Sequence, residues 1–319
     1  MKLVTYDTGD GIGRPGALVG DGSRIADLAA NSSGAVESVL WIAEGGESAL
    51  AQAQDAAKGS TQVSLDDVRL MAPIEPPPQM RDCLCFETHL IQAFKQARKL
   101  RASQMPDPEA AEREMEEQGI LSVPQTFYDQ PIYYKANRFS VVGHEHDVIW
   151  PGYSNFMDFE LEFGVYIGKP AKDVKKADAM DHVFGYTIFN DFTARDAQTA
   201  EMGGSLGPAK GKDFDTANPM GPCLVTADEF GDPYDKTMIC RVNGEEWGRG
   251  STSTMHWSFA DLIEHISASE TIRSGEFLGS GTVGNGCGLE HMRFLKPDDV
   301  VELEVEGIGV LRNRLVKPG

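Results

Sequence analysis

The sequence lacks the features that would place the chain in a membrane or on a nucleic acid. Its apolar runs are far shorter than the roughly 18 residues that a membrane-spanning helix needs, and the opening segment MKLVTYDTGDG has no apolar signal-peptide region. Positive charge is also scarce, with 29 basic residues against 49 acidic ones and a formal net charge of −20. Such a surface repels phosphate backbones and anionic lipids. We therefore expect a soluble, cytoplasmic protein that binds neither nucleic acid nor membranes.

Cysteines are few, and their spacing forms no recognisable pair. There are five of them, an odd number, and none belongs to a CxxC motif. This usage is typical of reduced thiols inside a cell and argues against a disulfide framework or a zinc site. We expect the cysteines to be packing residues. They are Cys83, Cys85, Cys223, Cys240 and Cys287.

The 319 residues are enough for one large domain and a small one. Residues 1–30 resemble short strands joined by glycine turns, and a helix is predicted over 35–56, followed by a short stretch to Leu70. The proline-rich segment APIEPPPQM, residues 72–80, cannot be crossed by a helix. We therefore predict a small N-terminal α+β domain over residues 1–72 and a second domain over 80–319.

The second domain is predicted to be rich in strands. A helix is expected over 86–102, and the charged run MPDPEAAEREMEEQG that follows it reads as a solvated helix or a mobile lid. From Gln130 onward strand patterns dominate, with helices expected only near 194–202 and 258–267. So many strands in one domain must dispose of their edges, which favours a closed or rolled sheet.

The segment MDFELEFGVYIGK, residues 157–169, alternates apolar residues with Asp158, Glu160 and Glu162. In an extended strand the three carboxylates would point to one face and the apolar side chains to the other. One interpretation is a half-buried strand with its polar face in water. The other is a cation site, because hard divalent cations bind converging carboxylate oxygens. The segment alone leaves both open.

Other polar residues stand where strands end or loops begin. Asp191 ends an apolar strand and shares a helical spacing of i, i+4 and i+7 with Arg195 and Gln198, although an N-cap and a surface salt bridge explain the same pattern. Lys212 lies in a loop rich in glycine and proline, where it could be a solvated charge. The glycine-dense stretch GSGTVGNGCGLE permits close backbone approach, either to a ligand or to another strand.

Taken together, these motifs resemble the fumarylacetoacetate hydrolase superfamily. The resemblance runs from MRDCLCFETHL and MDFELEFGVYIGK through GYTIFNDFTARDAQ, GKDFDTANPMGP and VNGEEW to GSGTVGNGCGLE and KPDDVVELEVEGIGVLRN. It covers about residues 80–315, in matching order and spacing. It implies a mixed β-roll catalytic domain, a homodimer, and a divalent metal held by carboxylates, with Mg²⁺ expected and Mn²⁺ or Ca²⁺ able to replace it.

The resemblance also implies roles for individual residues. His89 would be the general base, oriented by Glu290. An H-x-x-E dyad found in smaller members of the family is absent, because Gln92 stands at its second position. The implied metal ligands are Glu160, Glu162, Asp191 and Asp82. Lys212 would join His89 and Glu290 as a catalytic residue. The implied substrate-binding residues are Arg195, Gln198, Thr282, Tyr134 and Arg98.

The activity implied first is metal-dependent hydrolysis of a carbon–carbon bond in a β-diketone or acylpyruvate-type acid, as in the catabolism of aromatic compounds. Asp82, His89 and Glu290 together favour this hydrolysis. The same metal-enolate chemistry would also serve a decarboxylase or isomerase of 2-oxo acids of the oxaloacetate or hydroxymuconate type. A third alternative is a β protein that binds a cation without catalysis. In the first two cases the partner is a small oxo acid or diketone.

Overall fold

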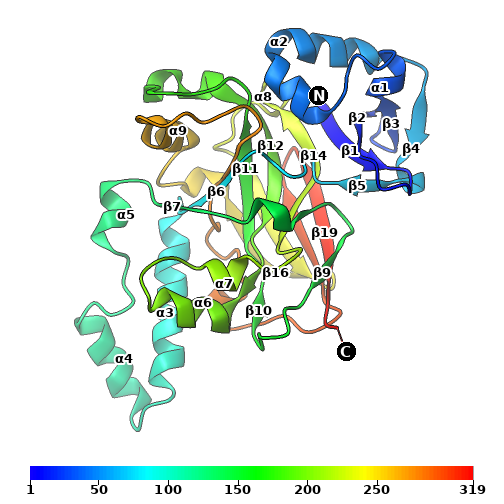
Figure 1. Cartoon of the computed structure of the whole chain (residues 1–319). Coiled ribbons are helices and arrows are strands. Elements are labelled where there is room, and N and C mark those ends of the chain that lie inside the picture. Colours follow the sequence, from blue (N-terminus) through cyan, green and yellow to red (C-terminus); the bar gives the residue numbers. More distant parts are fainter. Residues whose placement is uncertain (319) are drawn as a thin grey trace.

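A computed structural model describes residues 1–318 of the chain. Within them, the centre of the molecule is a mixed sheet of twelve strands (Figure 1). Ten of these follow the order β4-β3-β2-β1-β14-β12-β11-β17-β6-β7, while β5 pairs with β1 and β8 pairs with β14. The strands of this sheet are β1 (Lys2–Asp7), β2 (Arg14–Val19), β3 (Arg24–Asp27), β4 (Gln62–Ser64), β5 (Arg69–Met71), β6 (Met80–Cys83), β7 (Tyr133–Lys135), β8 (Val141–Val142), β11 (Leu161–Ile167), β12 (Val183–Asn190), β14 (Asn218–Thr226) and β17 (Phe277–Gly279).

A second sheet has the order β16-β15-β18-β19-β9. Its strands are β9 (Asp147–Ile149), β15 (Thr237–Val242), β16 (Glu245–Ser251), β18 (Val300–Val305) and β19 (Gly309–Val316). A short ribbon joins β10 (Met157–Asp158) to β13 (Thr193–Ala194). Most pairs are antiparallel, but β17 runs parallel to β6, β14 runs parallel to β8, and β19 runs parallel to β9. The mixed, strand-rich α+β architecture expected from the sequence is confirmed.

Helices lie at the periphery of the sheets. They are α1 (Leu28–Asn31), α2 (Val39–Ala56), α3 (Glu87–Ala102), α4 (Pro108–Glu117), α5 (Gln125–Asp129), α6 (Arg195–Met202), α7 (Ala209–Lys212), α8 (Ala227–Phe230) and α9 (Phe259–Ser267). Side chains mark several of their starts. Ser38 caps α2 by accepting from Trp41 N, and Ser258 forms a reciprocal capping box with Asp261 at α9. The charged run after residue 105 is the helix α4, which projects from the body with the end of α3 (Figure 1).

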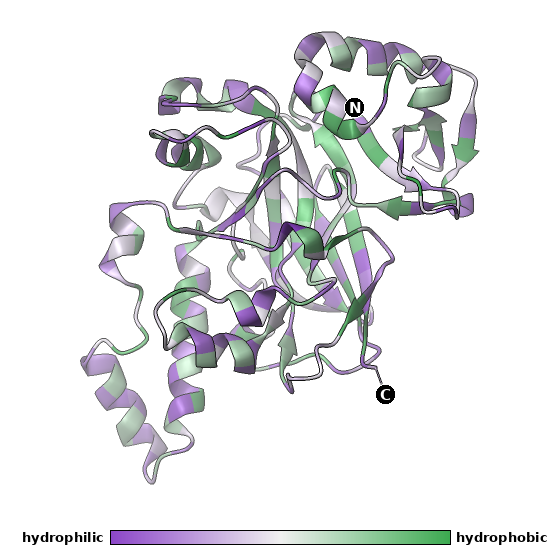
Figure 2. Ribbon diagram, in the orientation of Figure 1, coloured by the Kyte–Doolittle hydropathy of each residue, from purple (hydrophilic) through white to green (hydrophobic). Residues whose placement is uncertain are grey.

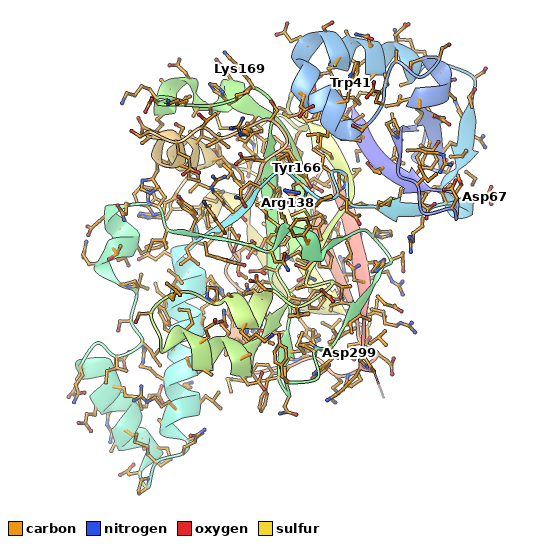
Figure 3. All side chains as sticks on the ribbon, in the orientation of Figure 1. Trp41, Asp67, Arg138, Tyr166, Lys169 and Asp299 are labelled. Carbon is orange, nitrogen blue, oxygen red and sulfur yellow. The ribbon has the colours of Figure 1, made fainter. Side chains whose placement is uncertain are left out.

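The core lies where apolar strands meet between layers. All seven residues of β11 are buried, and the central strands form the most apolar part of the ribbon (Figure 2). One apolar cluster joins residues such as Phe163 and Phe259 to the second sheet, and another joins Tyr166, in mid-molecule in Figure 3, to α2. Strand β17 approaches β11 closely at Gly164, where a Cβ would lie 2.3 Å from the Phe277 ring. Glycine is therefore required there.

The N-terminal segment is continuous with the main sheet. Lys2 and Leu3 of β1 pair with Val225 and Leu224 of β14, so strands β1 to β4 extend the sheet. Apolar side chains of α2, including Ile42, share a cluster with Phe277 of β17. The division of the chain at residues 72–80 stays a prediction. Of the helices in residues 1–318, none combines the length and apolar character required to cross a membrane.

Candidate active site

The sequence suggested one regular strand around Glu160, but the structure divides this acidic segment into two strands. Pairing breaks between β10 and β11, and Glu160 in the break forms an isolated bridge with Cys287. All three acids of the segment are buried, which excludes a polar face turned to water. They also take different partners: Asp158 and Glu160 contact cationic side chains, whereas Glu162 lies among other carboxylates.

Asp82, Glu162 and Asp191 form the first cluster of the site, with carboxylate oxygens that all lie within 4.8 Å of one another. Neighbouring strands bring them together. Asp82 on β6 pairs in register with Gly279 of β17, and β17 in turn pairs with β11, which carries Glu162. Asp191 directly follows β12, the other neighbour of β11. Residues far apart in sequence thus converge on one end of the sheet.

These three carboxyl groups are electrostatically costly. Burial raises the pKa of Asp82 to about 6. It raises the pKa of Asp191 to about 8, even though Lys212 lowers it. Burial, with the charges of Asp82 and Asp191, raises the pKa of Glu162 well above its usual value. A nearby cation would remove this repulsion and favour the ionised forms.

The cluster has the donors that a hard divalent cation needs. One buried oxygen of each member has no hydrogen-bond partner within the described residues: Asp82 Oδ1, Glu162 Oε2 and Asp191 Oδ1. Space between them is kept by Gly279, where a Cβ would lie 2.5 Å from Asp82 Oδ1 and 3.4 Å from Glu162 Oε2. Buried carboxylate oxygens without partners are rare unless an ion or water satisfies them. The residues present therefore fit a divalent cation bound by oxygen ligands.

Beside this cluster, Glu160 is satisfied by cations of the protein itself. Its oxygens lie 2.5 Å from Lys212 Nζ and 2.8 Å from an Arg195 nitrogen. Although burial raises the pKa of Glu160, Lys212 and Arg195 hold it below its usual value. Lys212 Nζ also lies 2.5 Å from Asp191 Oδ2, so the ammonium group links Glu160 to the carboxylate cluster. Lys212 is at the end of the short helix α7, where the sequence suggested a loop.

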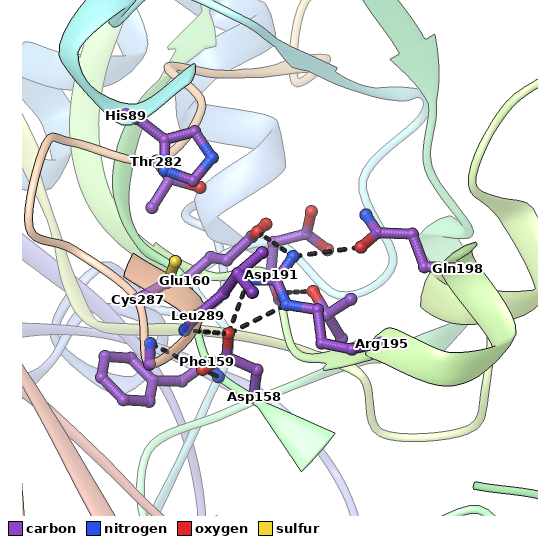
Figure 4. A network of polar contacts seen from close by, with 12 residues as sticks. His89, Asp158, Phe159, Glu160, Asp191, Arg195, Gln198, Thr282, Cys287 and Leu289 are labelled. Atoms are coloured by element: carbon purple, nitrogen blue, oxygen red, sulfur yellow. Dashed lines mark hydrogen bonds and ion pairs between the residues drawn. The ribbon is translucent and has the colours of Figure 1, made fainter. Parts of the chain in front are cut away.

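Asp158 anchors Arg195 from the other side (Figure 4). Its Oδ2 accepts from Arg195 Nε at 2.9 Å and Nη2 at 2.7 Å, and also from Leu289 N at 2.9 Å. Its Oδ1 accepts from Gly288 N at 2.7 Å and from Phe159 N. Gly288 has no room for a side chain, because a Cβ would lie 2.6 Å from Asp158 Oδ1. Asp158 therefore ties the guanidinium group to the turn that carries Glu290.

His89 and Glu290 form a buried pair next to these carboxylates. His89 lies in the first turn of α3, and its Nδ1 is 3.1 Å from Glu290 Oε1. Glu290 is held in turn by the backbone, since it accepts from Cys287 N at 2.9 Å and from Asn285 N at 3.2 Å. A carboxylate at one ring nitrogen orients the ring and stabilises its protonated form. Such a pair can move a proton at the other nitrogen.

Of the predicted substrate-binding residues, four lie in this network and one does not. Arg195 donates to Gln198 Oε1, Tyr134 Oη donates to Asp191 Oδ2, and Thr282 Oγ1 donates to Glu162 Oε1. Arg98 is different: its guanidinium donates to Leu121 O and Glu116 Oε1, and so fastens α3 to α4. Within residues 1–318, no hydrogen bond or ion pair joins Arg98 to the carboxylates. Its substrate role stays a prediction.

Sequence reasoning missed three members of the site. Asp158 was seen only as part of an acidic strand, although its position two before Glu160 was the available signal. Gln92, at the place of a missing glutamate, donates to Asn285 Oδ1 and accepts from Asn285 N, which helps to position the glycine-dense turn. Cys287 was expected only to pack, and no spacing in the sequence points to its position beside His89 and Glu290. All five cysteines are free and buried, as expected.

Comparison with known proteins identifies the family. The profile described as fumarylacetoacetate (FAA) hydrolase C-terminal matches residues 108–316, which include Glu160, Glu162, Asp191 and Glu290. This chain belongs to the fumarylacetoacetate hydrolase family. Asp82 and His89 precede the matched range, and it is the fold that brings Asp82 to Glu162 and His89 to Glu290.

Similar proteins are named for several different activities. The human mitochondrial oxaloacetate tautomerase FAHD2A is 31% identical over 319 residues, covering 99% of this chain and 92% of the relative. A probable 2-hydroxyhepta-2,4-diene-1,7-dioate isomerase from Mycobacterium abscessus has a similar structure, with TM-score 0.72, 27% identity and complete coverage of both chains. The fumarylacetoacetate hydrolase of Exiguobacterium antarcticum superposes with TM-score 0.74 at 26% identity, again over both whole chains.

Proposed function

We propose that this protein is a divalent-metal-dependent tautomerase that interconverts the keto and enol forms of a 2-oxo acid of the oxaloacetate type. The observation that carries the proposal is the set of three partnerless carboxylate oxygens beside the His89–Glu290 pair. The choice of tautomerisation is supported by the human oxaloacetate tautomerase, which is similar over 99% of this chain. The cytoplasmic location and the homodimer stay predictions.

Asp82, Glu162 and Asp191 would hold the cation. Glu160, the fourth ligand that the resemblance implies, would first have to give up its contacts with Lys212 and Arg195. An all-oxygen donor set suits Mg²⁺, with Mn²⁺ or Ca²⁺ as alternatives. When bound, such a cation would polarise the 2-oxo group of the substrate and thereby acidify the neighbouring carbon.

The residues of the chain would then move one proton. Tautomerisation breaks a C–H bond next to the oxo group and forms an O–H bond on the oxo oxygen, with no net gain or loss of atoms. His89 would take the proton from carbon while Glu290 stabilises the imidazolium ring, and the ring would return the proton to oxygen. Lys212 keeps its proton, since Asp191 and Glu160 hold its pKa above the usual value although burial lowers it. Its positive charge would favour the developing oxyanion.

Hydrolysis of a carbon–carbon bond, the activity that the sequence favoured first, is the second candidate. The same His89–Glu290 pair could activate water, and the structural likeness to the fumarylacetoacetate hydrolase of Exiguobacterium antarcticum supports it. Tautomerisation ranks first because it needs only the proton transfer and because the human tautomerase is 31% identical to this chain, against 26% for the hydrolase. A role in aromatic catabolism belongs to this second candidate.

The test follows the ultraviolet absorbance of enol-oxaloacetate, which is lost as the keto form appears. With Mg²⁺ or Mn²⁺ we expect the protein to accelerate this loss, without forming pyruvate and without cleaving acylpyruvates. Pyruvate formation would identify a decarboxylase instead, and cleavage of acylpyruvates without accelerated tautomerisation would identify a hydrolase. Either result would contradict the proposal.

His89→Ala should lower the metal-supported tautomerisation rate by about 10²–10⁴-fold, the usual contribution of a positioned acid–base group. The matched control is His265→Ala on α9, since His265 lines a separate hollow with Trp257 and Asp261. We expect the control to keep the wild-type rate. Equal rates in the two variants would remove His89 from the mechanism.

A further inference from the structure

A second set of metal-binding atoms lies next to the carboxylate cluster. A ring nitrogen of His89, Sγ of Cys287 and a carboxylate oxygen of Glu290 all lie within 4.8 Å of one another, and all three residues are buried. Among the described residues, the thiols of Cys83, Cys85 and Cys287 have no hydrogen-bond partner, whereas Cys223 Sγ and Cys240 Sγ each contact a backbone carbonyl. Of the three uncommitted thiols, Cys287 is the one that lies in such a set of donors. Cys287 therefore brings an uncommitted sulfur to the proton-transfer pair. Figure 4 shows Cys287 and His89 in the same network as Glu160 and Asp191.

The donor atoms are of a different kind from those of the carboxylate cluster. Asp82, Glu162 and Asp191 offer only oxygen, which suits hard cations, whereas the second set offers nitrogen, sulfur and oxygen. A mixed set of this kind is typical of zinc. Donor preference thus separates two neighbouring positions by the cations they would take.

The distances are compatible with zinc. Tetrahedral ligands at the usual zinc bond lengths lie roughly 3.3–3.6 Å from one another. His89 Nδ1 and Glu290 Oε1 are 3.1 Å apart, and no pair of donors in the set exceeds 4.8 Å. Side-chain shifts of about 1 Å or less would therefore complete three corners of a tetrahedron. The fourth corner would be left for water.

We propose that His89, Cys287 and Glu290 form a second metal site, which takes a borderline cation such as Zn²⁺ and inhibits the enzyme when occupied. Zinc binding rests on these three side chains, whereas the inhibition rests also on the proposed function. Within the set of three donors, Cys287 supplies the only sulfur.

Occupation of this site would change the state of each ligand. Burial and the charge of Glu290 raise the pKa of the Cys287 thiol well above its usual value, so the free thiol holds its proton. Formation of the zinc–sulfur bond releases that proton to solvent. A nitrogen lone pair of His89 and a carboxylate oxygen of Glu290 go to the metal, so the pair can no longer move the proton of a substrate.

The first experiment is independent of turnover and uses Co²⁺ as a spectroscopic substitute for zinc. Thiolate ligation gives cobalt a charge-transfer band in the near ultraviolet. We expect the band in the wild type and in Cys223→Ser, a matched change at another buried cysteine. We expect no band in Cys287→Ser. Absence of the band from the wild type, or its persistence in Cys287→Ser, would overturn the proposal.

Glu162→Gln extends this experiment to a chain that keeps Cys287, so that the result does not depend on the folding of Cys287→Ser. Because Glu162 belongs to the other cluster, the thiolate band should persist in Glu162→Gln. Loss of the band there would show that thiolate ligation depends on the carboxylate cluster, and would overturn the proposal of a separate site. Since no substrate is present, failure of the proposed tautomerase activity would leave this result unaffected.

The second experiment measures inhibition by Zn²⁺ in excess Mg²⁺, relative to the uninhibited rate of each variant. Loss of a partner that only supports a metal ligand weakens metal affinity by about 10–100-fold, so loss of the ligand should raise the inhibitory zinc concentration by about 10-fold or more. We expect this shift in Cys287→Ser and none in Cys223→Ser. Equal zinc sensitivity in the wild type and Cys287→Ser would show that zinc acts elsewhere and would refute the inhibitory site.

Discussion

Glu160 and Glu162 stand two residues apart on one segment, yet they occupy opposite electrostatic environments. Lys212 and Arg195 hold the pKa of Glu160 below its usual value, despite burial. Burial and the charges of Asp82 and Asp191 raise the pKa of Glu162 far above its usual value. The fold therefore supplies its own cations to one carboxylate and withholds them from the other. This division is what suits the Glu162 side to an added metal ion.

The contrast also bears on stability. A buried carboxylate with no cation costs free energy of folding, and a chain selected for stability alone would pair it or replace it. Perturbed, unpaired groups of this sort gather at functional sites. The paired half of the site keeps Lys212 and Arg195 in place, and the unpaired half remains available for a ligand.

The largest effect we predict is that the same glutamate-to-glutamine change has opposite effects on the free energy of unfolding at residues 160 and 162. In metal-free protein, Glu160→Gln should lower the free energy of unfolding by about 3–5 kcal/mol, because it takes one of two carboxylate partners from buried Lys212 and from buried Arg195. Glu162→Gln should leave that free energy unchanged or raise it, since it removes one of three repelling carboxylates. Urea denaturation after chelation of metal checks both. Destabilisation of similar size in the two variants would erase the contrast.

The next effect sharpens the role of Asp158 on the paired side. Both oxygens of Asp158 accept hydrogen bonds, from Arg195 or from backbone N–H groups. In either orientation, the NH₂ group of Asp158→Asn would therefore face at least one hydrogen-bond donor. We expect a loss of about 1.5–3 kcal/mol in unfolding free energy, the range for hydrogen bonds to charged groups. The control is Asp196→Asn, whose carboxylate accepts from Ser154 Oγ and Asn155 N at a more exposed position. Thermal denaturation of both variants measures the difference, and equal losses would deny Asp158 its special position.

The smallest effect concerns pH and the carboxylate cluster of Asp82, Glu162 and Asp191. The carboxyl groups of Asp82 and Asp191 have pKa values raised to about 6 and about 8 from an ordinary value of 3.8. Below about pH 4 both are protonated in folded and unfolded protein alike. Between about pH 4 and 8 the unfolded chain ionises more readily, so the metal-free protein should lose stability as pH rises.

Mg²⁺ should offset this loss, with more stabilisation at pH 8 than at pH 5, because the ligands must be ionised to bind it. At a concentration about ten-fold above its dissociation constant, the added stability is about 1.4 kcal/mol. Melting temperatures with Mg²⁺ or with chelator at each pH test the expectation. Stabilisation that is equal at both pH values would mean that Mg²⁺ binds elsewhere.

Local patterns predicted much of the secondary structure. The helix expected over 86–102 is Glu87–Ala102, and the one over 258–267 is Phe259–Ser267. Both helices carry apolar residues at helical spacing, and α9 also has a clear start signal at Ser258. These signals are local in the sequence, so they can be recognised without the fold. Short helices such as α5 and α7 were not predicted, because four or five residues carry too little periodicity to distinguish a helix from a loop.

The site was predictable only in part. The resemblance drew attention to Asp82, Glu162 and Asp191, but their convergence depends on β17, which lies between β6 and β11 and comes from the far end of the chain. No local pattern encodes such long-range pairing. The same limit explains Arg98, whose helical position is equally compatible with a ligand and with the contact to Leu121 O that it makes. It also explains why the two partners of Lys212 could not be named from its loop-like surroundings.

The pairing of β1 with β14 has a consequence for shortened versions of this chain. Lys2 and Leu3 occupy the backbone donors and acceptors of β14 at Val225 and Leu224. Removing residues 1–72 would leave that stretch of β14 as an unpaired strand edge. It would also expose to solvent the apolar side chains that α2 now covers. Exposed edges of this kind recruit other chains and promote aggregation. The N-terminal segment therefore acts as a protective cover for the catalytic sheet.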